Sequence, residues 1–229
     1  MTKYPEAGKV KMRLAESIGT KAATGLYRSF IKDTLTTVQS LSIPYHIAVH
    51  PPESLDRFVQ WLGPSHQSFQ QQGSDLGKRL QNGFRTMFEK EYQQVIALAS
   101  DSPDLPLEVL QTAISKLQIH EAVIGPATDG GYYLIGFSNA LFNPDFFEDI
   151  HWSTDTVFQE TLSRIHSVTN QVHVLPEWPD IDTNTDLRRF YKTHELQPAK
   201  TLHTMDYLRS NPRLLQTLLR DDTFQADGE

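Results

Sequence analysis

Apolar positions along the chain alternate between stripes with helical spacing and short continuous runs. The first stripe predicts a helix that begins near Gly19 and Thr20, and similar stripes cover residues 55–62, 76–88 and 107–117. Ser153 is expected to cap a helix with apolar positions from 157 to 165, and Asn211, followed by Pro212, to cap the last helix. The chain therefore contains at least six predicted helices.

The continuous apolar runs predict buried strands that alternate with these helices. They cover residues 45–49, 95–99, 122–124, 132–137 and 172–175. Such alternation predicts an α/β fold with a three-layer, mostly parallel sheet flanked by helices. We expect a single domain over residues 1–229, with a C-terminal helical extension over about 196–229. The leucines of the last helix are the one indication of a homodimer surface.

The N-terminal stretch departs from this pattern. In a parallel α/β sheet, the first element is usually a buried strand that delivers the chain to a ligand loop. Residues 3–13 have the composition of a loop, and no apolar run precedes them. The first strand is therefore expected to be missing. Either the natural N-terminus is longer and contains it, or the sheet forms without its usual first strand.

Composition narrows the classes of partner. The formal net charge of −7 opposes binding of a nucleic acid polymer, so any polyanion that the chain holds should be small, such as a nucleotide. The absence of cysteine excludes disulfides and thiolate chemistry. Neither a signal-like leader nor a stretch long enough to span a membrane is present, so we expect a cytoplasmic protein.

The basic loop near the N-terminus is the first candidate for chemistry. Gly8 allows close approach of the backbone, and the cations Lys9, Lys11 and Arg13 follow at alternating positions. Loop amides and such cations can converge on a pyrophosphate. An ordinary solvated basic turn would have the same composition, and the spacing alone does not separate the two interpretations.

Two acidic segments supply candidate metal ligands. Asp101 directly follows the predicted strand 95–99, where ligands of open α/β sheets bind, and suits a hard cation such as Mg²⁺. Asp104 is better interpreted as a helix cap. In the segment 178–187, Asp182 is an acidic residue that a cap formed by Thr183 and Asp186 does not need, so it is the candidate for a second metal ligand.

Three further segments are candidates for nucleotide, sugar or acceptor binding. Gly73, Asp75 and Gly77 lie at a helix start and suit a base or ribose, or equally an ordinary cap. Asp129, Gly130, Gly131 and Tyr132 suit sugar hydroxyls, although a plain hairpin turn explains the same residues at least as well. Trp152 suits an acceptor pocket, but tryptophan is more often part of a core.

Taken in order, these motifs resemble a bacterial family of nucleotide-diphospho-sugar transferases with the GT-A-like fold, described as radical-SAM-associated or arsenosugar-biosynthesis glycosyltransferases. The resemblance covers residues 3–187. It rests on the segments Lys3-Tyr4-Pro5, Gly8-Lys9, Lys11, Arg13-Leu14, Gly73, Asp75-Leu76-Gly77, Asp101 to Leu105, Asp129 to Leu134, Trp152-Ser153-Thr154 and Asp180 to Thr183. Met12 stands where the family pattern has threonine.

The resemblance implies a role for each motif. It implies that Asp101 and Asp182 are ligands of Mg²⁺ or Mn²⁺. It also implies that the three cations of the basic loop contact phosphates and that residues 73–77 contact the nucleotide. It implies a metal-dependent glycosyltransferase that takes a nucleotide-sugar donor and a small-molecule acceptor, with Asp129 the candidate catalytic residue. Small nucleotidyltransferases share the layout, so joining an NTP to a phosphorylated acceptor is the alternative, and a catalytically degenerate nucleotide-binding protein is the third.

Overall fold

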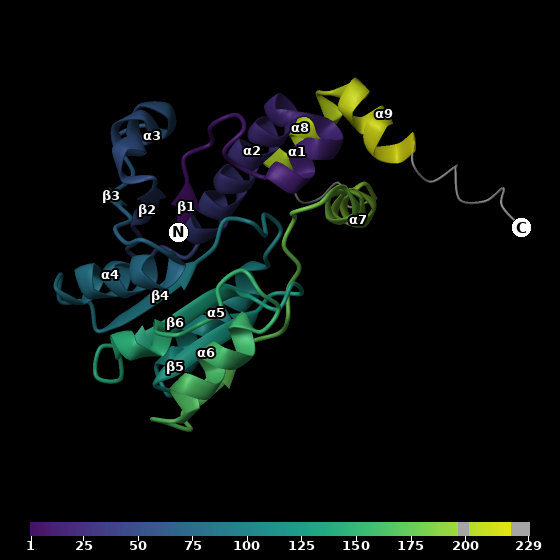
Figure 1. Cartoon of the computed structure of the whole chain (residues 1–229). Coiled ribbons are helices and arrows are strands. Elements are labelled where there is room, and N and C mark those ends of the chain that lie inside the picture. The colour runs from purple at the N-terminus through teal and green to yellow at the C-terminus, as the bar shows by residue number, and fades with distance from the viewer. Residues whose placement is uncertain (197–201, 221–229) are drawn as a thin grey trace, which may run out of the picture. The chain divides into compact units, whose positions relative to one another are not determined.

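The computed structural model describes residues 1–196 and 202–220, which group into two compact units (Figure 1). The first, here called the sheet unit, comprises Met1–Tyr4, Thr37–Ser100 and Leu105–Asp180. The second, the helical unit, comprises Pro5–Thr36, Asp101–Asp104 and the described part of Ile181–Glu229. Part of the expected C-terminal extension, residues 197–201 and 221–229, lies outside the described residues.

The sheet unit contains two hydrogen-bonded sets of strands. In the first set, three strands run parallel in the order β1-β2-β3: Thr2–Lys3, Ile47–His50 and Ser68–Gln70. In the second set, the order is β4-β6-β5-β7: Gln94–Leu98, Tyr132–Ser138, Ala122–Pro126 and Val172–Val174. Strand β6 runs antiparallel to both of its neighbours, whereas β5 and β7 are parallel.

A short first strand is present where the sequence lacks an apolar run. In β1, Thr2 pairs with Val49 of β2, and the Thr2 side chain is buried. The backbone nitrogen of Met1 donates to the Leu98 carbonyl oxygen of β4 at 2.7 Å, and the hydroxyls of Ser100 and Thr2 lie 3.3 Å apart. The expectation of a missing strand is therefore corrected to a two-residue strand held between β2 and the end of β4.

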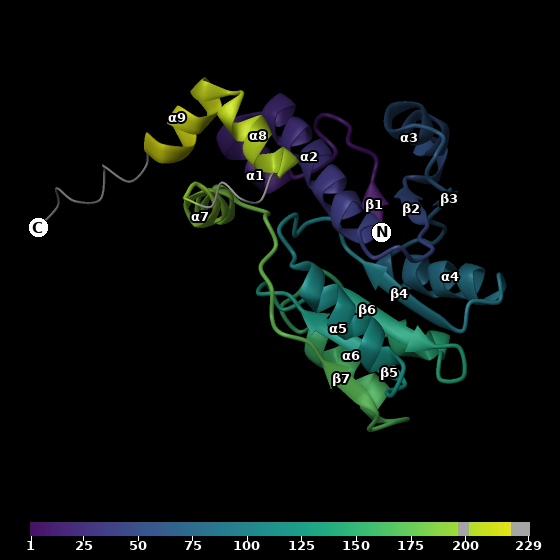
Figure 2. The same cartoon turned by 180° about the vertical axis from the view of Figure 1, so that it is seen from behind.

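Helices cover both faces of the four-stranded set. The four α-helices of this unit are α3 to α6: Leu55–Leu62, Leu76–Phe88, Leu107–Leu117 and Val157–His166. Alternate residues of β5 pack on opposite sides, because Ile124 joins the cluster with Phe84 of α4, and Val123 joins the cluster with Leu110 of α5. Helices α6 and α5 accordingly lie on opposite faces (Figure 2). The predicted three-layer α/β architecture is confirmed.

The start of α6 differs from the sequence expectation. Ser153 has a left-handed backbone conformation, with φ of 69°, and lies in a turn before the helix. The helix begins at Val157, with Thr156 as its N-cap residue. Apolar periodicity located this helix correctly, but Ser153 is not its cap, because three further residues belong to the turn.

The helical unit consists of five helices among the residues described: α1, the larger part of α2, α7, α8 and α9. Their bounds are Met12–Ile18, Thr20–Gln39, Asn184–His194, His203–Arg209 and Pro212–Arg220. The Asp33 carboxylate of α2 accepts hydrogen bonds from the backbone of His203 at 2.7 Å and of Thr204 at 2.9 Å. Asp33 thus caps α8 from a distant part of the chain, and burial raises the pKa of its carboxyl.

Helix α9 packs within its own unit. Leu214 is mostly buried, and Leu218 is fully buried, whereas Leu219 remains 39% exposed. Much of the apolar stripe that suggested a homodimer surface is thus covered by the chain itself, and the homodimer stays a prediction.

Every helix within residues 1–196 and 202–220 is too short or too polar to span a lipid bilayer.

Candidate functional site

The two aspartates predicted as metal ligands are brought together by backbone contacts in the helical unit. The backbone nitrogen of Ile181 donates to the carbonyl oxygen of Asp101 at 3.0 Å. The following residues form the start of α7, where Thr183 and Asp186 make a reciprocal capping box. This cap fixes the chain directly after Asp182, so residues that are 81 positions apart (182 − 101) present their carboxylates together.

Lys11 lies between these two carboxylates. Its Nζ forms an ion pair with Oδ1 of Asp101 and another with Oδ1 of Asp182, the latter at 2.6 Å. The Lys11 side chain is only 4% exposed, and the rings of Tyr27 and Phe30 have their centroids 5.9 and 5.8 Å from Nζ. Burial alone would lower the pKa of Lys11, but the two carboxylates outweigh it and raise this pKa well above its usual range.

Arg13 supplies a second cation on the outer side of Asp182. Its guanidinium Nη2 lies 2.8 Å from Oδ2 of Asp182, and its side chain is 66% exposed. Burial would raise the pKa of Asp182, but Lys11 and Arg13 together lower it below its usual range. Two cations thus balance the charges of the two aspartates. We call these four residues, Lys11, Arg13, Asp101 and Asp182, the lysine-aspartate cluster.

The donor set of this cluster fits a hard divalent cation. Among residues 1–196 and 202–220, no group of three or more histidine, aspartate or glutamate side chains is arranged to hold a metal. Two carboxylate oxygens that converge on one point are what Mg²⁺ takes from many proteins, with phosphates and water as its other ligands. Asp101 and Asp182 would hold the ion, at the place that the Lys11 ammonium now takes.

The remaining residues of the basic loop behave differently from Lys11. Gly8 has φ of 75°, a left-handed conformation that favours glycine, and lies in a turn in which the Lys9 nitrogen donates to the Glu6 carbonyl oxygen at 3.1 Å. Lys9 is exposed to solvent. The three predicted phosphate cations therefore fall into one buried residue and two exposed ones, a division that the alternating spacing does not reveal.

The predicted nucleotide loop lies in the sheet unit and opens α4. The Asp75 carboxylate accepts a hydrogen bond from the Lys78 nitrogen at 2.8 Å, which makes Asp75 the N-cap of α4 and lowers the pKa of its carboxyl. Gly73 has φ of 140°, in the range that favours glycine. The capping interpretation thus accounts for Asp75, and nucleotide contact by this loop stays a prediction.

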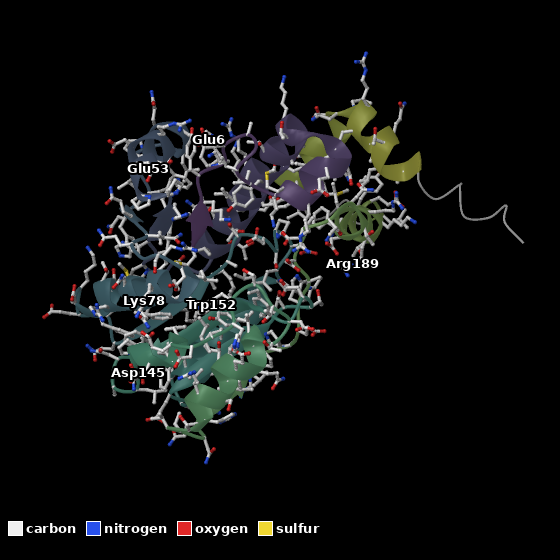
Figure 3. The ribbon with its side chains drawn as sticks, viewed as in Figure 1. Glu6, Glu53, Lys78, Asp145, Trp152 and Arg189 are labelled. Carbon is white, nitrogen blue, oxygen red and sulfur yellow. The ribbon has the colours of Figure 1, made fainter. Side chains whose placement is uncertain are left out.

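Gly77 and Trp152, predicted separately, lie in direct contact in the sheet unit. A Cβ atom on Gly77 would lie 2.9 Å from the indole nitrogen of Trp152 and 2.8 Å from the Phe147 carbonyl oxygen. Nearby, Nζ of Lys78 pairs with Glu148 at 2.5 Å, and Figure 3 shows the labelled Lys78 and Trp152 side chains. Trp152 is half-buried against the core, so its role as an acceptor contact also stays a prediction.

The Asp129 segment forms the turn between β5 and β6. Oδ1 of Asp129 accepts a hydrogen bond from the Gly131 nitrogen at 2.9 Å. Gly130 has φ of 88°, and a Cβ atom there would lie 2.2 Å from the Asp155 carbonyl oxygen, so only glycine fits. The Tyr132 hydroxyl is buried, which raises the pKa of this group. These contacts agree with the hairpin interpretation, while Asp129 itself remains exposed.

Asp104 has a partner that the sequence did not suggest. Its Oδ2 lies 2.9 Å from Nε2 of His194, and both side chains are largely buried in the helical unit. Helix α5 has Pro106 at its N-cap position and no side-chain cap, so the expected capping role of Asp104 is wrong. A pair that joins residues 90 positions apart leaves no local signal in the sequence.

Comparisons with known proteins find chains of related structure. A proposed nucleotide-diphospho-sugar transferase of Desulfovibrio desulfuricans G20 has a similar structure, with a TM-score of 0.87 and 40% identity over 95% of each chain. Rv0371c of Mycobacterium tuberculosis H37Rv gives a TM-score of 0.49 at 16% identity, over 71% of this chain and 83% of that one. A cytidylyltransferase of Leptospira borgpetersenii gives 0.41 at 11% identity, over 75% and 78%. No curated protein matches the chain.

The fold is therefore that of the nucleotide-diphospho-sugar transferase type, and the resemblance inferred from the motifs is confirmed. Residues 34–154 match the family model DUF2064, described as an uncharacterized protein conserved in bacteria. The chain belongs to this family.

Proposed function

We propose that this protein is a transferase that uses a nucleotide-sugar donor and depends on a divalent metal, Mg²⁺ or Mn²⁺. The observation that carries the proposal is the lysine-aspartate cluster, in which Asp101 and Asp182 converge on one buried cationic atom. The similarity in fold and sequence to the proposed nucleotide-diphospho-sugar transferase of Desulfovibrio desulfuricans supports the choice of donor.

The residues of the cluster suit departure of a nucleoside diphosphate. In glycosyl transfer, negative charge grows on the departing diphosphate, and a bound metal would supply Lewis-acid stabilisation of that charge. Arg13 presents a largely exposed guanidinium beside Asp182, and such a planar group binds phosphate through two hydrogen bonds. Lys9 is an exposed cation in the same loop. Residues 73–77 are proposed as the contact to the nucleotide.

A panel of nucleotide sugars tests this function. The protein is incubated with each donor and Mn²⁺, with and without candidate small-molecule acceptors, and the nucleoside diphosphate released is measured. We expect release from at least one donor and none after chelation of the metal. Pyrophosphate release from a nucleoside triphosphate, without nucleoside diphosphate release from any sugar donor, would instead establish nucleotidyl transfer.

Calorimetry separates catalysis from binding without chemistry. UDP, GDP and CTP are titrated into the protein with and without Mn²⁺, and the titrations are repeated with Asp101→Ala. We expect tighter binding with metal and loss of that gain in the variant, because Asp101 would help to hold the metal and a bound cation would attract the phosphates. Affinity that is indifferent to both changes would identify a degenerate nucleotide-binding protein.

Asp129 is proposed to contact the sugar or acceptor hydroxyls, with a catalytic role. Asp129→Asn keeps an oxygen that can accept the Gly131 hydrogen bond, so the turn and the thermal stability should be preserved. If the carboxylate acts as a base, turnover should fall by about 100-fold or more. Asp129→Ala, which also loses the turn bond, should in addition be less stable by about 1 kcal/mol. Full activity of Asp129→Asn would leave the residue with its turn role alone.

A further inference from the structure

The Lys11 ammonium takes the space that a cation bridging Asp101 and Asp182 would need. Both carboxylates contact the same Nζ atom through their Oδ1 oxygens, and the side chain that carries it is 4% exposed. If a divalent cation were held by these two oxygens, the ammonium could not occupy the same place. We propose that Lys11 and the divalent cation exchange at the aspartate pair, which rests on the metal dependence proposed above.

Charge balance explains why exchange is required. Lys11 and Arg13 together neutralise Asp101 and Asp182, so the cluster as it stands has no excess negative charge to attract a divalent ion. Adding a divalent ion beside the retained ammonium would place like charges in contact where the lysine side chain is shielded from water. Moving the ammonium away lets the divalent cation balance the two carboxylates, and the positive charge of Arg13 is then left to attract a phosphate.

The lysine side chain is suited to leave. Lys11 directly precedes α1, and its backbone has the left-handed values φ 48° and ψ 50°. The side chain packs near Tyr27 and Phe30 but is fixed at its end only by the two carboxylates among the contacts described. A flexible four-carbon stem that ends in three donors can turn to a phosphate oxygen once the carboxylates are taken.

Exchange unites the predicted and the observed role of Lys11. The motif predicts a phosphate contact, and the structure shows a carboxylate contact; in the exchange, these are two states of one side chain. The metal must compete with Lys11 when no nucleotide is present, whereas a nucleotide phosphate offers the displaced ammonium a new partner. Metal and nucleotide therefore assist one another's binding, and by linkage each raises the other's affinity by the same factor.

Titration with Mn²⁺ in the absence of nucleotide tests the competition. Free Mn²⁺ is measured by electron paramagnetic resonance for the wild-type chain, for Lys11→Met and for the matched control Lys9→Met, which removes one exposed charge from the same loop. We expect Lys11→Met to bind Mn²⁺ about tenfold more tightly than wild type. Lys9→Met should remain within about twofold of wild type, because an exposed charge contributes little.

A measurement on the wild-type chain keeps the proposal testable if Lys11→Met does not fold. The ammonium group of a buried, ion-paired lysine gives a ¹H–¹⁵N NMR signal that is protected from exchange with water. Saturation with diamagnetic Mg²⁺ should abolish or shift the Lys11 signal, whereas a signal unchanged at saturation overturns the exchange.

The outcomes separate this inference from the proposed function. Mn²⁺ affinity that is equal in wild type and Lys11→Met, or weaker in the variant, overturns the exchange and leaves metal-dependent transfer standing. Failure of both proteins to bind Mn²⁺, even with UDP present, overturns the exchange and the metal dependence together. Tighter binding by Lys11→Met that disappears on adding Asp182→Asn supports the exchange at this aspartate pair.

Discussion

Asp182→Ala is expected to lower the free energy of unfolding by about 2–4 kcal/mol, because it leaves the buried Lys11 ammonium with one carboxylate instead of two. Breaking a buried ion pair completely costs about 3–5 kcal/mol, and Asp101 retains part of the compensation here. Urea unfolding followed by circular dichroism measures the difference, with the m-value reporting whether unfolding stays two-state.

A double variant identifies the cause of this loss. Lys11→Met in the Asp182→Ala background removes the ammonium that Asp101 alone compensates only in part, so the double variant should be more stable than Asp182→Ala alone by about 1 kcal/mol or more. The exposed Asp155 supplies a matched control, since Asp155→Ala should change stability by less than about 0.5 kcal/mol. If the two changes at the cluster simply add, Lys11 is not the group that Asp182 stabilises.

The pH dependence provides an independent check on the same pair. The pKa of Asp182 in the folded chain is lowered, so the stabilisation from its charge is fully present above its unfolded pKa of about 3.9 and is lost as pH falls through the lower folded value. The stability difference between wild type and Asp182→Ala should therefore shrink below about pH 4. A difference that stays constant down to pH 2 would point to packing instead of charge.

The elements that the sequence predicts well are those whose pattern is local. Helix α4 shows a helical stripe after Asp75, which is its cap in the structure. Helix α7 has too few apolar positions to show a helical stripe, so its sequence indicates only the capping box at its start. Helix α1 lacks a signal in the sequence, because it begins at the end of a stretch with loop-like composition and its N-cap residue Lys11 makes no capping hydrogen bond. Strand β3 is also absent from the predicted elements, because it has only three residues and two of them are polar.

The candidate site shows the same division between local and distant information. The resemblance paired Asp101 with Asp182, and the Ile181 backbone contact shows how the chain brings them together. Nothing in an alternating run of basic residues indicates that Lys11 is buried while Lys9 and Arg13 are exposed. The direction of each side chain depends on where helix α1 begins, and the sequence pattern did not reveal that helix.

Metal-free stability and metal-dependent chemistry make opposite demands on the same two carboxylates. In the structure, the Lys11 ammonium pairs with both aspartates and so offsets the repulsion between them. In the proposed reaction, both must bind the metal. Substitution of the aspartates therefore has a stability effect and a catalytic effect, and the two must be measured separately. Asp101→Asn suits this purpose, because it removes one negative charge while keeping the shape and an oxygen acceptor for Lys11.

Asp101→Asn is expected to lower kcat/KM for the nucleotide-sugar donor by about 100-fold to 1000-fold, the range found when one group that stabilises transition-state charge is removed. A neutral amide oxygen binds Mg²⁺ or Mn²⁺ less strongly than a carboxylate does, so Asp182 and the phosphates would have to hold most of the metal. Initial rates of nucleoside diphosphate release, measured at several Mn²⁺ concentrations, give the loss and show how much of it comes from weaker metal binding.

The exposed Asp145, labelled in Figure 3, provides the control for that measurement. Asp145→Asn makes the same chemical change outside the lysine-aspartate cluster and should retain the wild-type rate. Circular dichroism of Asp101→Asn at the assay temperature establishes that the variant is folded, so a lower rate reports on chemistry. A folded Asp101→Asn with wild-type kcat/KM at every Mn²⁺ concentration would show that this aspartate does not hold a catalytic metal, and the transfer would then have to draw its charge stabilisation from Lys11 and Arg13.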